Sequence, residues 1–429
     1  ASKTVVGDMY GIEAKRINDD LLGRTLDSIY QHVEDIQSEI ALSSIGRYKI
    51  DLEAIHYDLT SLYFEGEMES SDIVRYGYSR DHRPDRKQIN LGMDVTAEGA
   101  VPINHKVYEG NRADVKTVIE NMRALKKRLK RCIILQDRGT VSKTILTKIE
   151  DGGFLFIVGL SRNSKVKEFL QSLNLEDFRV LDYKRGGGLY KGLDTRYNFG
   201  REYRAVVIHS SQLEERRKTR KRHMDRILKR LRDMDSKLNT RRYRKKKYAQ
   251  EQLFKLKSRY PKVWKYFKIE LKGEDNSLTL NYRVDECVLQ KDEYIDGMYI
   301  LLTNVEDYSM ENILISYRSR AFVENRIKNL KSHLRIRPIY LHKDRRIVSL
   351  VLITILALMI YSIIELLCRR GGYEITARTA LEYFEKLNVV YIKDEEGWFI
   401  SIEDPTPIQS TLLNLMEIDI HQITLSPVW

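Results

Sequence analysis

The sequence contains few cysteines. Only Cys132, Cys287 and Cys368 occur in 429 residues, far apart and without a CxxC pair. This distribution argues against a disulfide framework and against a structural zinc site, and it fits a reducing compartment. The first residues, ASKTVVGDMYGIEAKR, also lack an apolar signal segment and an initiator Met. We therefore expect a cytoplasmic protein whose chain has been trimmed at its start.

Long uncharged runs are scarce as well, with one exception at residues 347–364. This run, IVSLVLITILALMIYSII, contains 18 residues without a charge, which is the lower limit for a membrane span. It nevertheless includes two serines, a threonine and a tyrosine, and pairs of arginines flank it on both sides. We favour a fully buried core helix, with a membrane span as the alternative.

Positive charge is abundant. The chain has 74 Lys and Arg against 61 Asp and Glu, for a net charge of +13. Such an excess indicates a polyanionic partner, most often nucleic acid and less often an anionic membrane. Residues 211–260 concentrate it in RRKTRKRHMDRILKRLR and RRYRKKK. This stretch reads as long helices, and we favour a phosphate-contacting surface over a merely solvated helix face.

The pattern of residues 53–160 predicts an α/β domain. Three runs rich in β-forming residues come first, and their short links favour antiparallel pairing. A helix, a short apolar strand, a second helix and a fifth strand follow; in order, the seven elements are expected at 53–66, 89–96, 101–110, 114–129, 131–137, 142–153 and 154–160. This is the ribonuclease-H-like order, a mixed sheet flanked by helices.

The remaining chain is divided around this core. We expect a helical N-terminal unit at 1–50, which could be a truncated DNA-binding region, and the first part of the core at 51–160. A basic insertion of helices and strands would occupy 161–310, and the C-terminal helices of the core 311–370. Residues 371–429 form a tail without readable chemistry.

Three carboxylates fit the chemistry of such a core. Asp58 lies within the first strand, Asp137 ends the fourth strand, and Glu324 lies on the first helix after the insertion. A two-metal phosphodiester reaction needs hard anionic ligands on separate rigid elements, which these positions provide. Asp94, on the second strand, competes with Asp58 for the first position. Each aspartate could instead serve a structural role in the sheet or in a turn.

The helix around Glu324 has an unusual charge pattern. In YRSRAFVENRIKNLK, residues 317–331, a step of about 100° per residue puts Tyr317, Arg320, Lys328 and Lys331 on the same face as Glu324. A surface helix with i,i+4 ion pairs is the simpler interpretation. Arg318 and Arg326 project onto other faces, so we expect them to matter less than Arg320 and Lys331.

These segments together resemble the DDE transposases of bacterial and archaeal insertion sequences. Tyr317, Arg320, Glu324 and Lys331 match the spacing Y-x2-R-x3-E-x6-K of insertion-sequence family four. The DRG at 137–139 and YDLTSLYFE at 57–65 resemble the segments around that family's two aspartates. Two further stretches, GYSRDHRPDRKQ at 77–88 and DGMYILLTN at 296–304, are similar to segments of one branch, so the resemblance spans about residues 10–370.

The resemblance implies cleavage and strand transfer at the ends of a mobile element. Asp58, Asp137 and Glu324 would hold two Mg²⁺ or Mn²⁺ ions, while Tyr317, Arg320 and Lys331 would grip DNA phosphates; Lys328 is added from its place on the helix face. Trp264 is the candidate for stacking on a flipped base, with a core or turn role as its alternative. The expected partners are double-stranded terminal repeats and target DNA, bound by a homodimer associated with a prokaryotic nucleoid and not with a membrane.

Two other functions stay open at this point. A ribonuclease-H-like nuclease that cuts without joining would use the same carboxylates. A non-catalytic DNA-binding relative, derived from a decayed element, would tolerate loss of all three.

Overall fold

The computed structural model divides the chain into two compact units. Unit 1 comprises residues 1–157 and 315–429, and unit 2 comprises residues 158–314. The structure describes residues 16–69, 71–112, 117, 133–136, 141–183, 188–211, 214–393 and 398–420. The helix expected at 114–129 lies outside these ranges apart from residue 117.

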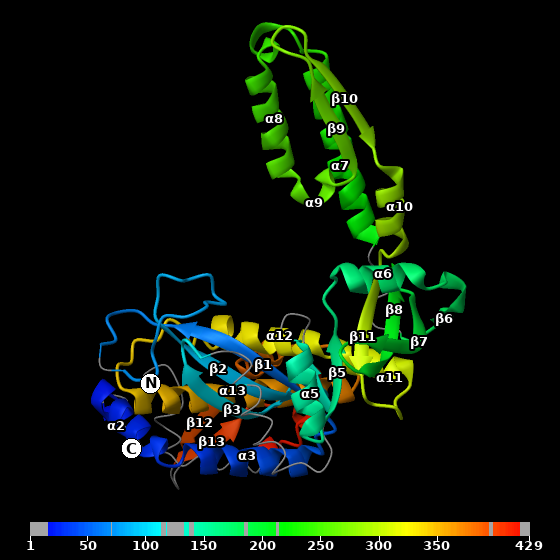
Figure 1. The fold of residues 1–429 in the computed structure, drawn as a ribbon. Helices are drawn as coiled ribbons and strands as arrows, with labels where there is room; N and C mark the ends of the chain where they lie inside the picture. Colours follow the sequence, from blue (N-terminus) through cyan, green and yellow to red (C-terminus); the bar gives the residue numbers. More distant parts are fainter. Residues whose placement is uncertain are drawn as a thin grey trace. The chain divides into compact units, whose positions relative to one another are not determined.

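A mixed sheet forms the centre of unit 1 (Figure 1). Its strands follow the order β3-β2-β1-β4-β5. β1 pairs antiparallel with β2, β2 pairs antiparallel with β3, and β4 runs parallel to β1. The predicted order of elements is confirmed for these strands, which are β1 (Ala54–Tyr63), β2 (Gln88–Thr96), β3 (Pro102–Glu109), β4 (Ile133–Gln136) and β5 (Leu155–Gly159). α5 (Lys143–Asp151) links the last two, with Ser142 capping its N-terminus.

One face of this sheet is covered by α12 (Arg320–Lys328) and α13 (Asp344–Arg370). The apolar side chains of alternate residues on β1 and β2 point into the shared core. These strand residues, Leu62, Ile89, Leu91, Met93 and Val95, pack with Val323 of α12 and with Ile347, Val351, Ile355 and Leu358 of α13. The core therefore fixes α12 against the sheet beside Asp58.

The apolar run at 347–364 is part of the core helix α13. Within the described residues, α13 is the helix long and apolar enough to span a membrane, yet 61% of its most apolar window is buried in the protein. Its polar hydroxyls are satisfied locally, because Ser349, Thr354 and Ser362 donate to carbonyls one turn earlier. Most of the run is buried against the sheet and helices, as predicted for a core helix, but it is not fully buried, since Ile353 and Ile360 are 42% and 59% exposed.

Smaller elements pack around α13 in unit 1. α2 (Asp19–Tyr30) contributes Asp27, which pairs with Arg345 and Arg346 of α13 at 2.7 and 2.8 Å. α3 (Val33–Tyr48) packs between β3 and α13. Towards its C-terminal end, α13 shares a core with α14 (Ala377–Phe384) and α15 (Pro407–Leu415), while β12 (Val389–Lys393) pairs with β13 (Trp398–Ile402). The described residues after 370 thus form helices and a hairpin.

Unit 2 contains a second group of strands, in the order β11-β8-β7-β6. They include β11 (Met298–Thr303) and the long hairpin of β7 (Tyr190–Asn198) and β8 (Glu202–Ser210), and the sequence analysis missed this hairpin. β8 is buried along most of its length and pairs with both β7 and β11. The other elements here are α6 (Ser164–Ser172), the 3-10 turn η2 (Leu175–Asp177), the short strand β6 (Arg179–Val180) and α11 (Met310–Arg318), which continues into unit 1.

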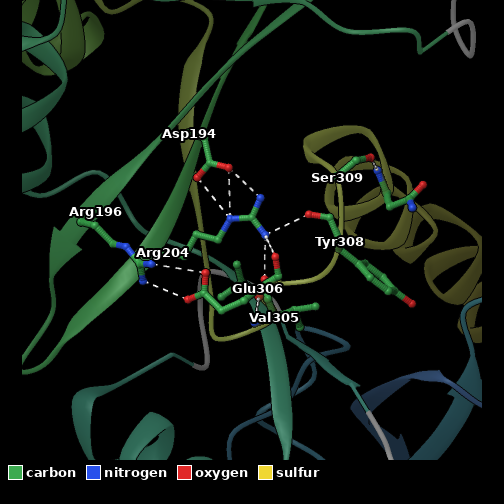
Figure 2. A network of polar contacts seen from close by, with 9 residues as sticks. Asp194, Arg196, Arg204, Val305, Glu306, Tyr308 and Ser309 are labelled. Carbon is green, nitrogen blue, oxygen red and sulfur yellow. Dashed lines mark hydrogen bonds and ion pairs between the residues drawn. The ribbon is translucent and has the colours of Figure 1, made fainter.

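Arg204 of β8 holds the segment between β11 and α11 (Figure 2). Its guanidinium donates to the carboxylate of Asp194 on β7, with a shortest distance of 2.6 Å, and to the backbone carbonyls of Val305 and Tyr308 at 2.8 and 2.9 Å. Only 9% of the Arg204 side chain is exposed. One buried cation therefore satisfies several acceptors at once.

The basic stretch predicted from the sequence forms a substructure within unit 2. α7 (Glu214–Asp235), the 3-10 turn η4 (Arg241–Arg244), α8 (Lys246–Arg259) and α9 (Pro261–Trp264) precede the hairpin of β9 (Phe267–Lys272) and β10 (Thr279–Val284), and α10 (Glu286–Tyr294) closes it. These elements share a separate core that includes Ile227, Leu231, Ala249, Val263 and Phe267. We call residues 214–294 the basic arm (Figure 1).

Candidate active site

Asp58 lies in the middle of β1, on the face covered by α12. In the strand register Asp58 is opposite Met93, whereas the competing Asp94 is opposite Tyr57. Because side chains alternate between faces, Asp94 belongs to the other side of the sheet, where it is fully buried and accepts a hydrogen bond from Asn104 at 2.8 Å. Asp58 is therefore the aspartate on the side of Glu324.

The environment of Asp58 disfavours its charged form. Burial raises the pKa of Asp58 to about 6, and the negative charge of Glu324 adds to this effect. The backbone N–H of Leu59, which donates to Oδ1 at 2.8 Å, and the charges of Arg320 and Arg80 act in the opposite direction. Asp58 is thus a poorly solvated carboxylate that a nearby positive charge would stabilise in its ionised form.

Glu324 projects from α12 with its side chain 60% exposed. Arg320, one turn earlier, lies 2.8 Å from it through Nη2. This is the i,i+4 ion pair that the simpler interpretation of the helix predicted, and it coexists with the electrostatic coupling of both residues to Asp58. Strand β1 and helix α12 thus bring two acidic groups and one arginine together.

A hydrogen bond between His56 and Ser319 holds β1 to the junction of α11 and α12. The His56 Nε2 and Ser319 Oγ atoms are 2.7 Å apart, and both side chains are buried. Burial, helped by the charge of Arg320, lowers the pKa of His56 to about 3, so its ring is neutral at physiological pH. Sequence reasoning missed this pairing, and its only signal was the position of His56 two residues before Asp58.

The third predicted carboxylate, Asp137, lies outside the described residues. The strand that leads to it, β4, runs parallel to β1 with Leu135 opposite His56 and ends at Gln136. The described part of the chain accordingly contains no group of three His, Cys, Asp or Glu side chains suited to a metal ion. Asp58 and Glu324 supply the hard oxygen ligands that Mg²⁺ and Mn²⁺ prefer, so the residues present fit such an ion.

The predicted DNA-contacting residues do not share one exposed face. Tyr317 is 9% exposed, and the Lys331 side chain is buried in an ion pair with Asp81 at 2.7 Å, whereas Lys328 is exposed. The projection assumed one regular helix over 317–331, and this is wrong. α11 ends at Arg318, α12 begins at Arg320, and Asn329–His333 form a π-helical turn that changes the angle per residue.

Arg326 has a structural position, because it is 1% exposed and bound to Glu365. Its lesser importance for catalysis and DNA binding stays a prediction. Trp264 is partly buried and packs on the core of the basic arm, which agrees with a core role. Its proposed stacking on a DNA base stays a prediction.

Comparisons with known proteins relate the chain to transposases. A structural comparison finds a piggyBac transposase, seen by cryo-EM in a synaptic complex with hairpin DNA, at a TM-score of 0.36 and 10% identity. The match covers 76% of this chain and half of that one. A search of curated protein sequences finds no match. A family profile described as a transposase DDE domain matches residues 60–360, beginning two residues after Asp58 and including Glu324. Since this is more than half of the chain, the protein belongs to the transposase DDE-domain family.

Proposed function

We propose that this protein is a transposase of insertion-sequence family four that cuts DNA at the ends of a mobile element and joins the freed 3′-hydroxyl to target DNA. The observation that carries the proposal is the proximity of Asp58 and Glu324, which come from distant parts of the sequence yet lie close enough for the charge of Glu324 to raise the pKa of Asp58. The family match and the Tyr317, Arg320, Glu324 and Lys331 spacing support it.

Asp58, Asp137 and Glu324 are the proposed ligands of two Mg²⁺ or Mn²⁺ ions. When bound, such ions activate the attacking oxygen and stabilise the leaving oxygen of a phosphodiester. The chain's own contribution is to hold Asp58 on a rigid strand and Glu324 on a helix packed against that strand. Arg320 favours the ionised form of Asp58 and pairs with Glu324, and His56 holds the helix junction in place.

The basic residues divide into near and distant contacts. Arg320 and Lys328 would contact phosphates at the cut, while Tyr317 and Lys331 would act from buried positions beside it. The exposed Arg241, Arg242 and Arg244 of the basic arm support a role in gripping the terminal repeats over a longer distance. Trp264 would stack on a flipped base only if it left its present packing.

The proposed setting follows from the reaction. Two transposon ends must be held together, so we propose a homodimer on double-stranded DNA. The location would be the prokaryotic cytoplasm, on the nucleoid and without a membrane partner.

A strand-transfer assay tests the proposal. Duplexes carrying the repeats that flank the gene are mixed with plasmid in Mg²⁺ or Mn²⁺, and nicked and joined products are resolved on a gel. We expect joined product from the wild type and none from Asp58→Asn or Glu324→Gln. Asp94→Asn and Glu311→Gln serve as matched controls that keep activity.

Other outcomes select the alternatives. Cleavage without joined product would identify a nuclease. Activity that survives both carboxylate substitutions would remove these residues from the mechanism. A wild type that binds the repeats but neither cuts nor joins them would indicate a non-catalytic relative.

A further inference from the structure

The loop between Arg75 and Gln88 contains the GYSRDHRPDRKQ motif and is firmly attached to the sheet of unit 1. Arg75 and Gln88 exchange two backbone hydrogen bonds at 3.0 and 2.9 Å. The buried amide of Gln88 donates to the carbonyls of Tyr78 and Gly110 at 2.9 and 3.0 Å. Ser61, on the same strand as Asp58, donates to the carbonyl of Tyr78 at 3.4 Å. The backbone of this loop is therefore preorganised.

An acidic residue of the loop connects it to the segment that follows Glu324. Asp81, only 4% exposed, lies 2.7 Å from Nζ of Lys331 and 2.5 Å from Nη1 of Arg337. Arg80, its neighbour, is close enough for its charge to lower the pKa of both Asp58 and Lys331. The loop thus lies beside the proposed catalytic carboxylates.

Two tyrosine rings on this fixed backbone face solvent. Tyr76 is 59% exposed and Tyr78 is 81% exposed. Cations accompany both rings: Lys87 lies 6.0 Å from the ring centre of Tyr76, and Arg80 lies 5.9 Å from that of Tyr78. Such exposure leaves most of each ring's apolar surface available for a partner.

Gly77, between the two tyrosines, fixes their spacing. A Cβ at this position would lie 2.0 Å from the carbonyl oxygen of Gly110, so the backbone here requires glycine. The rings therefore project from a backbone that passes tightly over another chain segment. This favours a fixed platform over two independently mobile side chains.

We propose that Tyr76 and Tyr78 form a stacking platform for unpaired DNA bases next to the cut, with Arg80 and Lys87 contacting the adjoining phosphates. Exposed aromatic rings interleaved with cations suit unpaired bases, whose faces are open, and not bases already stacked in a duplex. This inference rests on the proposed function. The platform further predicts that the protein binds DNA ends with unpaired bases more tightly than fully paired ends, which the proposed metal-binding carboxylates alone do not predict.

Fluorescence anisotropy in EDTA, which prevents cleavage, tests the platform. Two labelled probes share the terminal repeat; one is fully paired and the other has a few unpaired bases at the end. We expect the wild type to prefer the opened probe, and the Tyr76→Ala/Tyr78→Ala variant to lose roughly tenfold or more in affinity for it. The paired probe should bind nearly as before. Tyr76→Phe/Tyr78→Phe should retain the preference, because phenylalanine keeps the ring.

Tyr340→Ala is the matched control, since this tyrosine is 68% exposed in the same unit. It should bind both probes like the wild type. Equal loss on both probes would overturn the proposal in favour of a duplex-binding surface, and unchanged binding by the double alanine variant would overturn it outright. Cleavage by the wild type is measured separately in Mg²⁺. The binding assay therefore tests the stacking platform, and the cleavage assay tests the proposed function, so either proposal can be rejected while the other stands.

Discussion

Arg326 of α12 and Glu365 of α13 form an ion pair of 2.7 Å inside unit 1. The guanidinium also donates to the backbone carbonyls of Gly99 and Ala100, at 3.0 and 3.2 Å, in the turn between β2 and β3. The helix that carries Glu324 is thereby fastened both to the core helix and to the sheet. This attachment opposes any rotation of α12 that would displace Glu324 from Asp58.

We expect Arg326→Met to lower the free energy of unfolding by about 3 kcal/mol. Two carbonyls lose their donor, and Glu365 loses its closest cation, keeping only Arg369 at 3.8 Å and the backbone N–H of Ala377 at 3.1 Å. Arg326→Met/Glu365→Met should recover part of this loss, since no unpaired charge is then buried. Urea denaturation measures both effects. The partly exposed Arg318, changed to Met, serves as control and should cost less than about 1 kcal/mol. Equal losses for the two arginines would show that the buried pair contributes nothing special.

Arg204 and Arg196 provide a matched comparison in unit 2 (Figure 2). Arg204 is buried and binds Asp194 and backbone carbonyls, whereas Arg196 pairs at 2.9 Å with Glu306 on the surface, where the two side chains are 53% and 60% exposed. Arg204→Met should therefore destabilise the protein by roughly 3 kcal/mol, and Arg196→Met by less than about 1 kcal/mol. Thermal unfolding checks the difference. Arg204→Lys should rescue little, because one ammonium cannot reproduce the planar fork.

Periodicity predicted much of the core fold. The β-rich runs and the helices between them identified β1 to β5 and α5, and the uncharged run identified α13 as a core helix. Asp58 and Asp94 lie on opposite faces of the sheet, as their pairing in the strand register shows, and only Asp58 lies on the face of Glu324. The hairpin of β7 and β8 was missed because its residues 190–210 were read only as part of the basic insertion of helices and strands at 161–310.

Contacts between distant segments were not predictable from the same patterns. A helical projection identifies which residues share a face, but not what covers that face. Arg326 projected away from Glu324, yet the backbone of the β2–β3 turn and Glu365 bury it. The pairing of Lys331 with Asp81 joins segments 250 residues apart, and it depends on a π-helical turn that a regular projection omits.

The burial of His105 in β3 should make the folded protein less stable in acid. Burial lowers its pKa to about 4 from an ordinary value of 6.5, so between these values the unfolded chain binds a proton that the folded chain does not. Stability present at neutral pH is therefore lost as the pH falls, by about 2 kcal/mol between roughly pH 7 and pH 5.

Replacing this residue isolates its contribution. His105→Gln should flatten the stability curve over that range, because glutamine does not titrate. Subtracting the two curves cancels groups common to both, such as His56 and Asp58. Curves that remain parallel would assign the acid sensitivity elsewhere.

The basic arm should determine how DNA binding depends on salt. Changing Arg241, Arg242 and Arg244 to Ala should lower the slope of log affinity against log salt by up to about 0.9 for each phosphate that the variant no longer neutralises. Titrations of the terminal-repeat duplex at several salt concentrations measure this slope. A variant with Arg378 and Lys386 changed to Ala removes exposed cations from unit 1 and should leave the slope unchanged. If the arm variant kept the wild-type slope, the arginines of η4 would not contact DNA.

Arg320 should control the pH at which cleavage begins. Its positive charge lowers the pKa of Asp58, so Arg320→Ala should raise that pKa further above its ordinary value and leave less ionised carboxylate at neutral pH. We expect cleavage of the terminal repeat to fall roughly tenfold near pH 7, with the acid limb of the rate profile moving to higher pH. Arg320→Lys should restore part of both, because it keeps the charge. Arg320 and Arg80 are the cations that lower the pKa of Asp58, so Arg318→Ala should leave the profile in place. A fall in rate without a shift would mean that Arg320 acts on DNA alone, and equal damage from Arg318→Ala would contradict the distinction between the two arginines.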